Sequence, residues 1–514
     1  MTMHKFGKFS FSIFWTLIKL LIVLCIVNVV TGRLKNKSIK VTRMSSTVLT
    51  TAAKTIEQST VTTTTDPPST FYPDITPSPV PTIFTRANSF AAKINAFALN
   101  ILSTLVHSTS VTEVTNEIDG VHSTPSLSNY STSNVFPNGA TFKSGLVVQS
   151  NLAFSPTSLA TVLIMIYLGS GGTTSTEITR LLGLSRFSRK DFDGFPVFLS
   201  GLNTIRSLGN VVLNAQRLVV QSNIIDDGVH FEVNPFYLSS LKQNYKADLT
   251  RANFVNDSVK VAREINEWVA NMTQGHISEI LRAESLHSFT RMLILDITYF
   301  HGEWEKAFDG SSTSLEKFYV HANKTIEVSM MKRKGKYKSG YLQSISAQFL
   351  EIPFKNFELS FYIMLPDHYN GQNLSSLIEK LDIFQLNLML QNIPTFDTRI
   401  EVPKFSISSN LDMKIPFKRL GLSALFDSDK ANLSMMITNS SSPLFVSEFK
   451  HKVSFSVDER GAKGAAVSQA IIEARSSIED EFIANRPFLF IVVDNRVLSI
   501  LFLGIINTPN PAKD

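Results

Sequence analysis

Helical and strand-forming patterns occupy different halves of this 514-residue chain. Apolar residues from Phe90 to Leu105 recur at helical spacing, and Ser155-Pro156 before TSLATVLIMIYLG provides an N-cap and a first-turn proline for a buried helix. Later segments such as LILDITYF, LSFYIMLP and FLFIVVD are apolar runs of strand length. This segregation favours an α+β domain with antiparallel or mixed sheets over an alternating β/α barrel.

A short second helix is expected after Gly169. Thr174, followed three residues later by Glu177, has the spacing of a capping box at its start, and Gly183 is expected to stop it. A further helix face is marked by Val261 and Ile265.

The first 32 residues have the order of a secretory signal peptide. Lys5 and Lys8 precede an apolar run from Phe9 to Thr31 that ends in small residues. An uncleaved signal anchor is the alternative, because this run is near the roughly 20 residues that span a bilayer, although Lys19 disfavours deep burial. We therefore expect a secreted, extracellular protein, which is membrane-tethered if the segment is retained. Cleavage would also remove Cys25, the only cysteine, so the mature chain would have no disulfide.

Residues 33–86 are rich in Thr, Ser and Pro and are expected to form a disordered stalk, because they offer little apolar area to bury. One large domain is expected over residues 87–514, with a polar insertion at about 107–143. Eight N-x-S/T sequons fit an extracellular glycoprotein. They lie at Asn36, Asn129, Asn256, Asn271, Asn323, Asn373, Asn432 and Asn439.

Common catalytic and ligand-binding motifs are absent. The chain has no P-loop, dinucleotide fingerprint, HExxH or GxSxG motif, and its ten histidines lack metal-ligand spacing, so we expect no metal and no cofactor. The net charge of +6 is too diffuse to indicate a nucleic-acid partner. The segment KRKGKYK could bind a heparin-like polysaccharide, and the alternative is a solvated hairpin. Its cations are Lys332, Arg333, Lys334, Lys336 and Lys338.

The most informative segment lies between Val457 and Phe482. DERGAKGAAVSQAIIEARSSIEDE has no proline or aromatic residue and alone would suit a surface helix. However, its beginning at Glu459-Arg-Gly-Ala and the following NRPFLFIVVDNRVLSILFLGIINTPNP resemble the hinge and C-terminal signature of the serpins, a family of serine protease inhibitors. Three further blocks agree in the family's order, namely NLAFSPTS, INEWVANMTQGHI and DITYFHGEWEKAF. The resemblance spans about residues 88–511.

This resemblance implies a fold of three β-sheets and eight or nine α-helices with an exposed reactive-centre loop. A target protease cleaves the loop, which then inserts as a new strand in the large sheet and carries the covalently linked protease with it. Such a protein is a monomer that the protease attacks as a substrate, and it is not itself an enzyme. In the family the cleaved bond follows the hinge glutamate by sixteen residues, which from Glu459 gives Arg475-Ser476. An arginine there selects trypsin-like serine proteases. The alternatives are a non-inhibitory serpin that acts as a carrier or chaperone, and a glycan-binding surface protein.

The loop sequence can be tested against insertion, because a central strand places alternate side chains on opposite faces. The resemblance places the hinge at Glu459, Gly461, Ala462, Gly464, Ala465 and Ala466. Alternate residues from Ala462 to Ala470 are all small, whereas the other set carries long groups such as Lys463 and Glu473 and is expected to face solvent. We therefore predict a loop that can insert.

Two control regions also follow from the resemblance. The breach, which holds the hinge closed, matches Trp304, Lys404 and Glu459. The shutter, at the middle of the large sheet, matches Ser155, Ser158, Asp296 and His451. The family usually has asparagine where Asp296 stands. An acid there could pair with His451 and make sheet opening pH-sensitive, and the alternative is an ordinary buried hydrogen-bond cluster.

Overall fold

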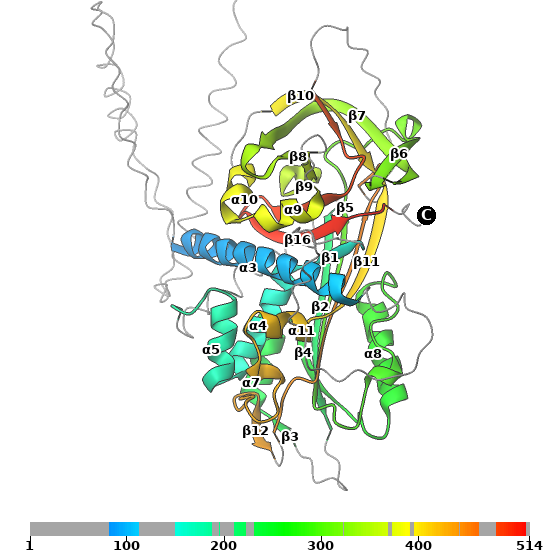
Figure 1. The fold of residues 1–514 in the computed structure, drawn as a ribbon. Helices are drawn as coiled ribbons and strands as arrows, with labels where there is room; N and C mark the ends of the chain where they lie inside the picture. The colour runs from blue at the N-terminus through cyan, green and yellow to red at the C-terminus, as the bar shows by residue number, and fades with distance from the viewer. Residues whose placement is uncertain are drawn as a thin grey trace, which may run out of the picture. The chain divides into compact units, whose positions relative to one another are not determined.

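The computed structural model describes ten segments of the chain, all within one compact unit that spans residues 78–514 (Figure 1). They are residues 82–112, 150–187, 195, 210–222, 231–321, 323–367, 373–390, 395–440, 443–461 and 480–509. The predictions for the signal segment, for nearly all of the stalk and the insertion, and for loop residues 462–479 lie outside them.

Eight α-helices occur in these segments. They are α3 (Thr82–Thr112), α4 (Pro156–Gly169), α5 (Gly172–Leu181), α7 (Pro235–Ser240), α8 (Ser258–Met272), α9 (Leu374–Lys380), α10 (Ile383–Leu390) and α11 (Lys414–Arg419). Ser155 caps α4 as predicted, because its side chain accepts a hydrogen bond from the backbone N–H of Ser158. Helix α3 begins at Thr82, inside the range predicted as stalk, and continues to Thr112.

Sixteen strands form three sheets in the described part of the chain. The strands are β1 (Leu152–Phe154), β2 (Asn210–Gln221), β3 (Phe231–Val233), β4 (Asp248–Ala252), β5 (Met292–Gly302), β6 (Ser314–His321), β7 (Lys324–Leu342), β8 (Ala347–Pro353), β9 (Leu359–Pro366), β10 (Thr395–Pro403), β11 (Phe405–Asp412), β12 (Ile437–Ser440), β13 (Glu448–Val457), β14 (Asp480–Ile483), β15 (Phe488–Asp494) and β16 (Ser499–Ile506). In the nine-stranded sheet, eight strands follow the order β1-β16-β15-β9-β8-β7-β10-β14, and the ninth, β6, pairs with β7. Five follow β11-β13-β5-β2-β4, and β12 pairs with β3. The predicted α+β class with three sheets is confirmed.

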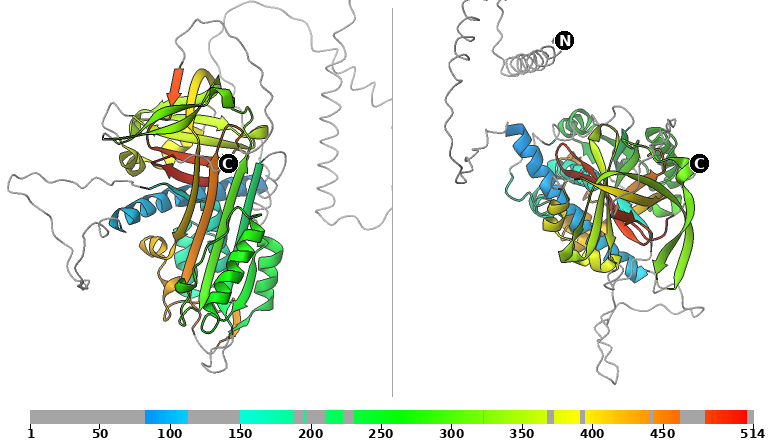
Figure 2. Two further views of the ribbon diagram at one scale, coloured as in Figure 1. Left: turned by 90° about the vertical axis from the view of Figure 1, so that its right-hand side faces the viewer. Right: turned by 90° about the horizontal axis from the view of Figure 1, so that it is seen from above.

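Both faces of the five-stranded sheet are buried near β5. Ile294 and Phe300 belong to the main core, whereas Leu293, Leu295 and Ile297 pack in a second cluster with α8. Figure 2 shows α8 lying along one face of the long strands. Burial on both faces explains why this strand is a continuous apolar run rather than an alternating one.

The predicted capping box at Thr174 is wrong. Helix α5 begins at Gly172, and Thr174 lies inside it. The Thr174 hydroxyl accepts the backbone N–H of Asn432 at 3.0 Å, and Glu177 accepts the N–H groups of Ser423 and Ala424 at 2.9 and 2.8 Å. Both side chains therefore satisfy the backbone of a segment distant in the sequence, which a local pattern cannot reveal.

The solvated hairpin considered for KRKGKYK is also wrong. The segment lies inside β7, whose residues Met330 to Lys338 pair without interruption with β10. Gly335 faces Thr398 within this ladder and forms no turn.

Within the described residues, one helical stretch is long and apolar enough to cross a membrane, Ser89–Val106 of α3. Its apolar face, including Phe97 and Ile101, is buried in the core, which is typical of a core helix.

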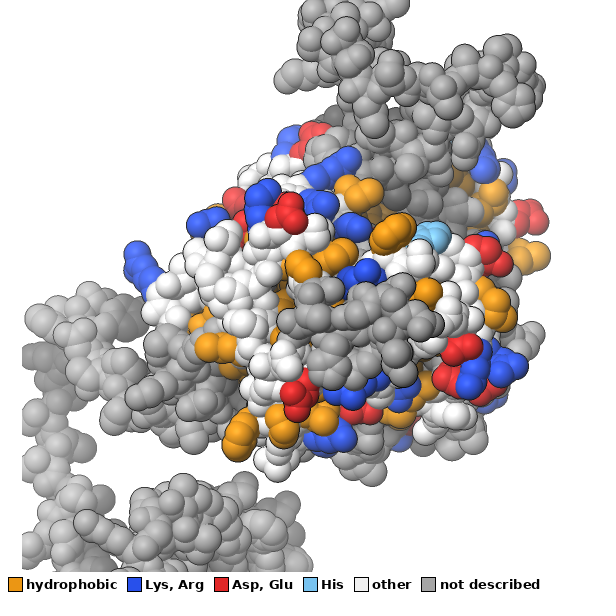
Figure 3. Space-filling model, turned by 90° about the horizontal axis from the view of Figure 1, so that it is seen from below, with side chains coloured by type: hydrophobic (Ala, Val, Ile, Leu, Met, Phe, Trp, Pro, Cys, Tyr) orange, Lys and Arg blue, Asp and Glu red, His pale blue; other side chains and the backbone are white. Residues whose placement is uncertain are grey.

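On the molecular face shown in Figure 3, basic and acidic side chains lie interspersed.

Candidate functional site: a strand-insertion seam between β5 and β13

Strands β5 and β13 are parallel neighbours, with residues paired from Leu293–Glu448 to Phe300–Phe455. We call the line between them the seam. The chain that leaves β13 can return beside it only as an antiparallel strand. A strand that entered the seam in this way would run antiparallel to both neighbours and could form hydrogen bonds with each. The topology therefore offers one place where the segment after Val457 can join the sheet.

A turn at residues 458–461 closes the upper end of the seam, and Glu459 anchors it. Lys404 Nζ lies 3.0 Å from Glu459 Oε2, and Thr313 Oγ1 donates to Glu459 Oε1 at 2.9 Å. The backbone N–H of Phe308 donates to the Glu459 carbonyl at 2.7 Å. Burial pushes the pKa of Glu459 upward, but hydrogen bonds from the backbone, Lys404 and Thr313 outweigh it and hold that pKa below its usual value.

Trp304 holds the same turn from the end of β5. Its ring N–H donates to the Asp458 carbonyl at 2.9 Å, and its backbone N–H donates to the Arg460 carbonyl at 3.1 Å. The indole stacks on Phe354, with the ring centroids 4.5 Å apart. The structure thus brings the three predicted breach residues to one turn.

Gly461 lies buried against the end of β5. Its φ is +88°, and a Cβ atom there would be 2.3 Å from the Gly302 carbonyl oxygen and 2.4 Å from the Trp304 nitrogen. Only glycine can occupy such a position. The other hinge candidates, Ala462, Gly464, Ala465 and Ala466, and the bond Arg475-Ser476 lie outside the described residues.

The four predicted shutter residues meet at the middle of the seam, and all are buried. Ser158 Oγ donates to Asp296 Oδ1 at 2.5 Å, and the backbone N–H of Ser155 donates to His451 Nε2 at 2.9 Å. Because Nε2 is an acceptor, the imidazole proton lies on Nδ1. Nδ1 is 2.9 Å from Asp296 Oδ2, but the two groups are not aligned as a hydrogen bond, so the contact is mainly electrostatic.

A fifth shutter residue, Gln216 on β2, was missed at the sequence level. Its amide N–H group donates to Asp296 Oδ1 at 3.1 Å and to Ser158 Oγ at 2.9 Å. An asparagine at position 296 has only one acceptor end: with its oxygen toward Gln216 its NH₂ group would face the His451 Nδ1–H, and with the amide turned over the NH₂ group would face the Gln216 N–H group. A carboxylate accepts from every neighbour, which accounts for the acid at this place. Because Gln216 lies 80 residues from Asp296 and carries no motif, only the β2–β5 pairing reveals the contact.

The segment that follows α8, residues 273–286, crosses the outer face of the seam. The His276 ring stacks on Tyr299 of β5 with centroids 4.0 Å apart, and the Ile280 carbonyl accepts from Asn410 of β11 at 3.2 Å. Between them, burial lowers the pKa of Lys452 on β13, while nearby Glu279 partly offsets the effect. We call residues 273–286 the strap. If the reactive loop inserted into the seam, the side chains that were expected to face solvent would therefore contact the strap along part of the strand.

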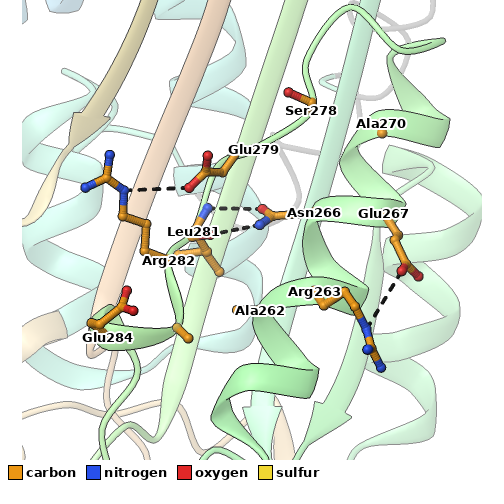
Figure 4. A pocket seen from close by; sticks show the side chains of 11 residues that line it. Ala262, Arg263, Asn266, Glu267, Ala270, Ser278, Glu279, Leu281, Arg282 and Glu284 are labelled. Atoms are coloured by element: carbon orange, nitrogen blue, oxygen red, sulfur yellow. Dashed lines mark hydrogen bonds and ion pairs between the residues drawn. The ribbon is translucent and has the colours of Figure 1, made fainter.

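Asn266 fastens the strap to α8. Its side chain accepts the N–H groups of Ile280 and Leu281 at 2.9 and 3.1 Å and donates to the Leu281 carbonyl at 2.8 Å. An open groove of about 580 Å³ lies between helix and strap (Figure 4). Two ion pairs, Arg263–Glu267 and Arg282–Glu279, form between residues that line this groove.

The basic segment in β7 lies among acids. Lys332 pairs with Glu316, Lys338 Nζ is 3.0 Å from Glu351 Oε2, and Lys336 lies opposite Asp397 in the ladder. The guanidinium of Arg333 lies over Phe308, and Lys334 lies opposite Arg399. The acidic neighbours of Lys332, Lys336 and Lys338 reduce the positive potential available to a polyanion, and polysaccharide binding stays a prediction.

Six of the predicted glycosylation sites are described. Asn256, Asn271, Asn323, Asn373 and Asn439 are exposed, and Asn432 is partly buried. Asn36 and Asn129 lie outside the described segments. Within those segments, no group of three or more His, Cys, Asp or Glu side chains could hold a metal ion.

Comparison with known proteins identifies the class. The serpin (serine protease inhibitor) sequence profile matches residues 142–509, which is well over half of the chain. The chain therefore belongs to the serpin family of protease inhibitors and is not an enzyme.

Particular proteins resemble this chain in sequence or in fold. A leukocyte elastase inhibitor of Xenopus tropicalis is 32% identical over 361 residues, which cover 70% of this chain and 93% of the relative. Human serpin B9 is 30% identical over 363 residues with the same coverage. Among solved structures, maspin matches with a TM-score of 0.66 and 24% identity over 83% of this chain and 100% of its own. Manduca sexta serpin-12 has a TM-score of 0.61 and 27% identity over 73% and 96%.

Proposed function

We propose that this serpin inhibits trypsin-like serine proteases by a single-use covalent mechanism. The protease cleaves Arg475-Ser476 and stays attached to Arg475 as an acyl-enzyme. The released segment from Ala462 onward then inserts into the seam and drags the protease along the sheet. The observation that supports this most strongly is the agreement between the register of β13 and the alternation of small residues in the loop.

The register follows from the hinge turn. Residues 458–461 form a four-residue turn after Val457, so a hairpin return would pair Ala462 with Val457. Gly464, Ala466, Ser468 and Ala470 would then face Phe455, Val453, His451 and Phe449, respectively. These β13 side chains are all buried, with at most 1% exposed. Paired residues of antiparallel strands point to the same face, so the small set would face the core, where large side chains would not fit.

Arginine at the cleaved bond supports a trypsin-like target. A trypsin-like specificity pocket carries a buried carboxylate, whereas that of an elastase is small. We therefore propose that this protein differs in target from the relative that is named for leukocyte elastase.

Incubation with trypsin followed by denaturing electrophoresis tests this function. A stable band at the sum of the two masses, absent in Arg475→Ala, supports it. Complete cleavage of the loop without a stable complex would instead support the alternative of a non-inhibitory serpin.

We also propose that the protein is secreted and N-glycosylated. The signal-like residues 1–32 and the five exposed sequons support this. Expression in cultured animal cells should place the protein in the medium, with a mass that falls on treatment with peptide N-glycosidase. Retention in the cytosol without a mass shift would contradict it.

A further inference from the structure

A second surface lies close to the place where the chain returns from the reactive loop. A groove of about 260 Å³ opens where β7, β8, β10 and β14 meet, at the end of the molecule opposite β3 and β12 (Figure 1). Strand β14 begins at Asp480, only five residues after Arg475. Asp480 itself lines the groove.

The groove has aromatic walls and an acidic rim. Tyr341 and Phe396 line it and remain 44% and 43% exposed. Gly340 leaves the floor open over Phe349, since a Cβ atom at Gly340 would lie 2.8 Å from that ring. Asp480 is exposed, and no basic side chain of the described segments forms an ion pair with it. An aromatic opening beside a free carboxylate suits the apolar stem and cationic head of a lysine or arginine.

The chain length decides what can reach this groove. Five residues span at most about 18 Å, so the bond at Arg475 cannot lie farther than that from Asp480. A trypsin-like domain of some 230 residues has a radius of gyration of about 17 Å. A protease bound at this bond is therefore large enough to reach β14 and its neighbours.

We propose that this groove is a docking site for the target protease and receives a lysine or arginine side chain from the protease surface. This inference rests on the proposed function and deepens it. The groove would contribute to target choice by speeding encounter and stabilising the complex before cleavage, independently of the arginine in the specificity pocket.

The test separates docking from trapping by using catalytically inactive trypsin. Its dissociation constant from the full chain is measured for the unaltered protein, for Tyr341→Ser/Phe396→Ser and for Asp480→Asn. Phe384→Ser and Asp257→Asn, which alter an exposed aromatic ring and an exposed acid that do not line the groove, are the matched controls. We expect each groove variant to weaken binding by about tenfold, as for residues central to an interface, and the controls to leave it unchanged. The loss of affinity caused by Asp480→Asn should be smaller at high salt, because salt screens the charge of the carboxylate.

Equal binding by the groove variants and the unaltered protein would overturn the docking site, as would the absence of measurable binding by the unaltered protein. A failed proposed function gives a different result, namely no covalent complex with active trypsin. Urea unfolding of each variant confirms that the fold is retained.

Discussion

The carboxylate of Asp296 and the imidazole of His451 face each other across the seam, with Oδ2 and Nδ1 2.9 Å apart and neither side chain exposed. They are also register partners on β5 and β13. A strand inserted between these strands would separate their backbones from about 5 Å to about 10 Å. The contact can therefore exist only in the closed sheet, and the proposed register would bring Ser468, the one hydroxyl residue of the small set, to the gap between them.

Replacing Gln216 by glutamate should destabilise the closed sheet. The new carboxylate would face Asp296 Oδ1, which now accepts from Gln216 at 3.1 Å. Two buried carboxylates at that distance cannot both stay charged, so we expect a loss of about 3 kcal/mol in the free energy of unfolding. The double variant Gln216→Glu/Asp296→Asn restores an amide–carboxylate pair and should recover part of the loss, measured by urea denaturation. A double variant no more stable than Gln216→Glu would show that the two side chains are not coupled.

The hinge anchor should make stability depend on pH through Glu459. Its pKa is lowered in the folded state, so the carboxylate stabilises the fold fully above the unfolded value of about 4.3, and this contribution disappears as the pH falls through the lower folded value. Glu459→Gln should therefore be less stable than the unaltered protein at pH 7 but nearly equal to it well below pH 4. Urea unfolding at both pH values measures the difference. If the stability difference between Glu459→Gln and the unaltered protein were equally large at acid pH, the Lys404 pair and the Thr313 hydrogen bond would be excluded as its cause.

Gly461→Ala should disrupt the hinge more than its backbone angle alone can explain. Gly421 provides the matched control, because its φ is also +88° but no atom lies within 4 Å of a Cβ placed there. We expect Gly421→Ala to cost about 1 kcal/mol and Gly461→Ala to cost at least about 3 kcal/mol, since the latter also collides with Gly302 and Trp304. Chemical denaturation reports both values. Equal costs would mean that the hinge turn can move away from β5 freely.

Ala462→Arg should convert the inhibitor into a substrate of trypsin. In the proposed register this side chain faces buried Val457, so a cation there would block entry into the seam. The neighbouring Lys463→Arg carries the same side chain on the other face and should still inhibit. The number of inhibitor molecules consumed per trapped protease is the measurement. It should rise at least tenfold for Ala462→Arg, the scale of a kinetic penalty above 1.4 kcal/mol. Full inhibition by Ala462→Arg would contradict the register.

Much of the architecture could be predicted from local pattern. The N-cap at Ser155 and the strand of residues 359–366 follow from residue types within one turn or one short run, and the structure has both. The capping box at Thr174 failed for the opposite reason, since its side chains are used by residues more than 240 positions away. The basic segment at Lys332–Lys338 looked like a turn because glycine and lysine avoid strands, but pairing with β10 overrides that weak preference.

The candidate site likewise combines features that local sequence predicts with features that depend on contacts between distant residues. By itself the sequence determined the family and the alternation of small residues, and it predicted the hinge and the cleaved bond, because each of these follows from consecutive residues. Only the tertiary structure decided that β5 and β13 are parallel neighbours, that Gln216 completes the shutter around Asp296, and that the strap crosses the seam. These relationships depend on which distant strands pair and in which register. That choice is made by the packing of the whole core, and no local pattern encodes it.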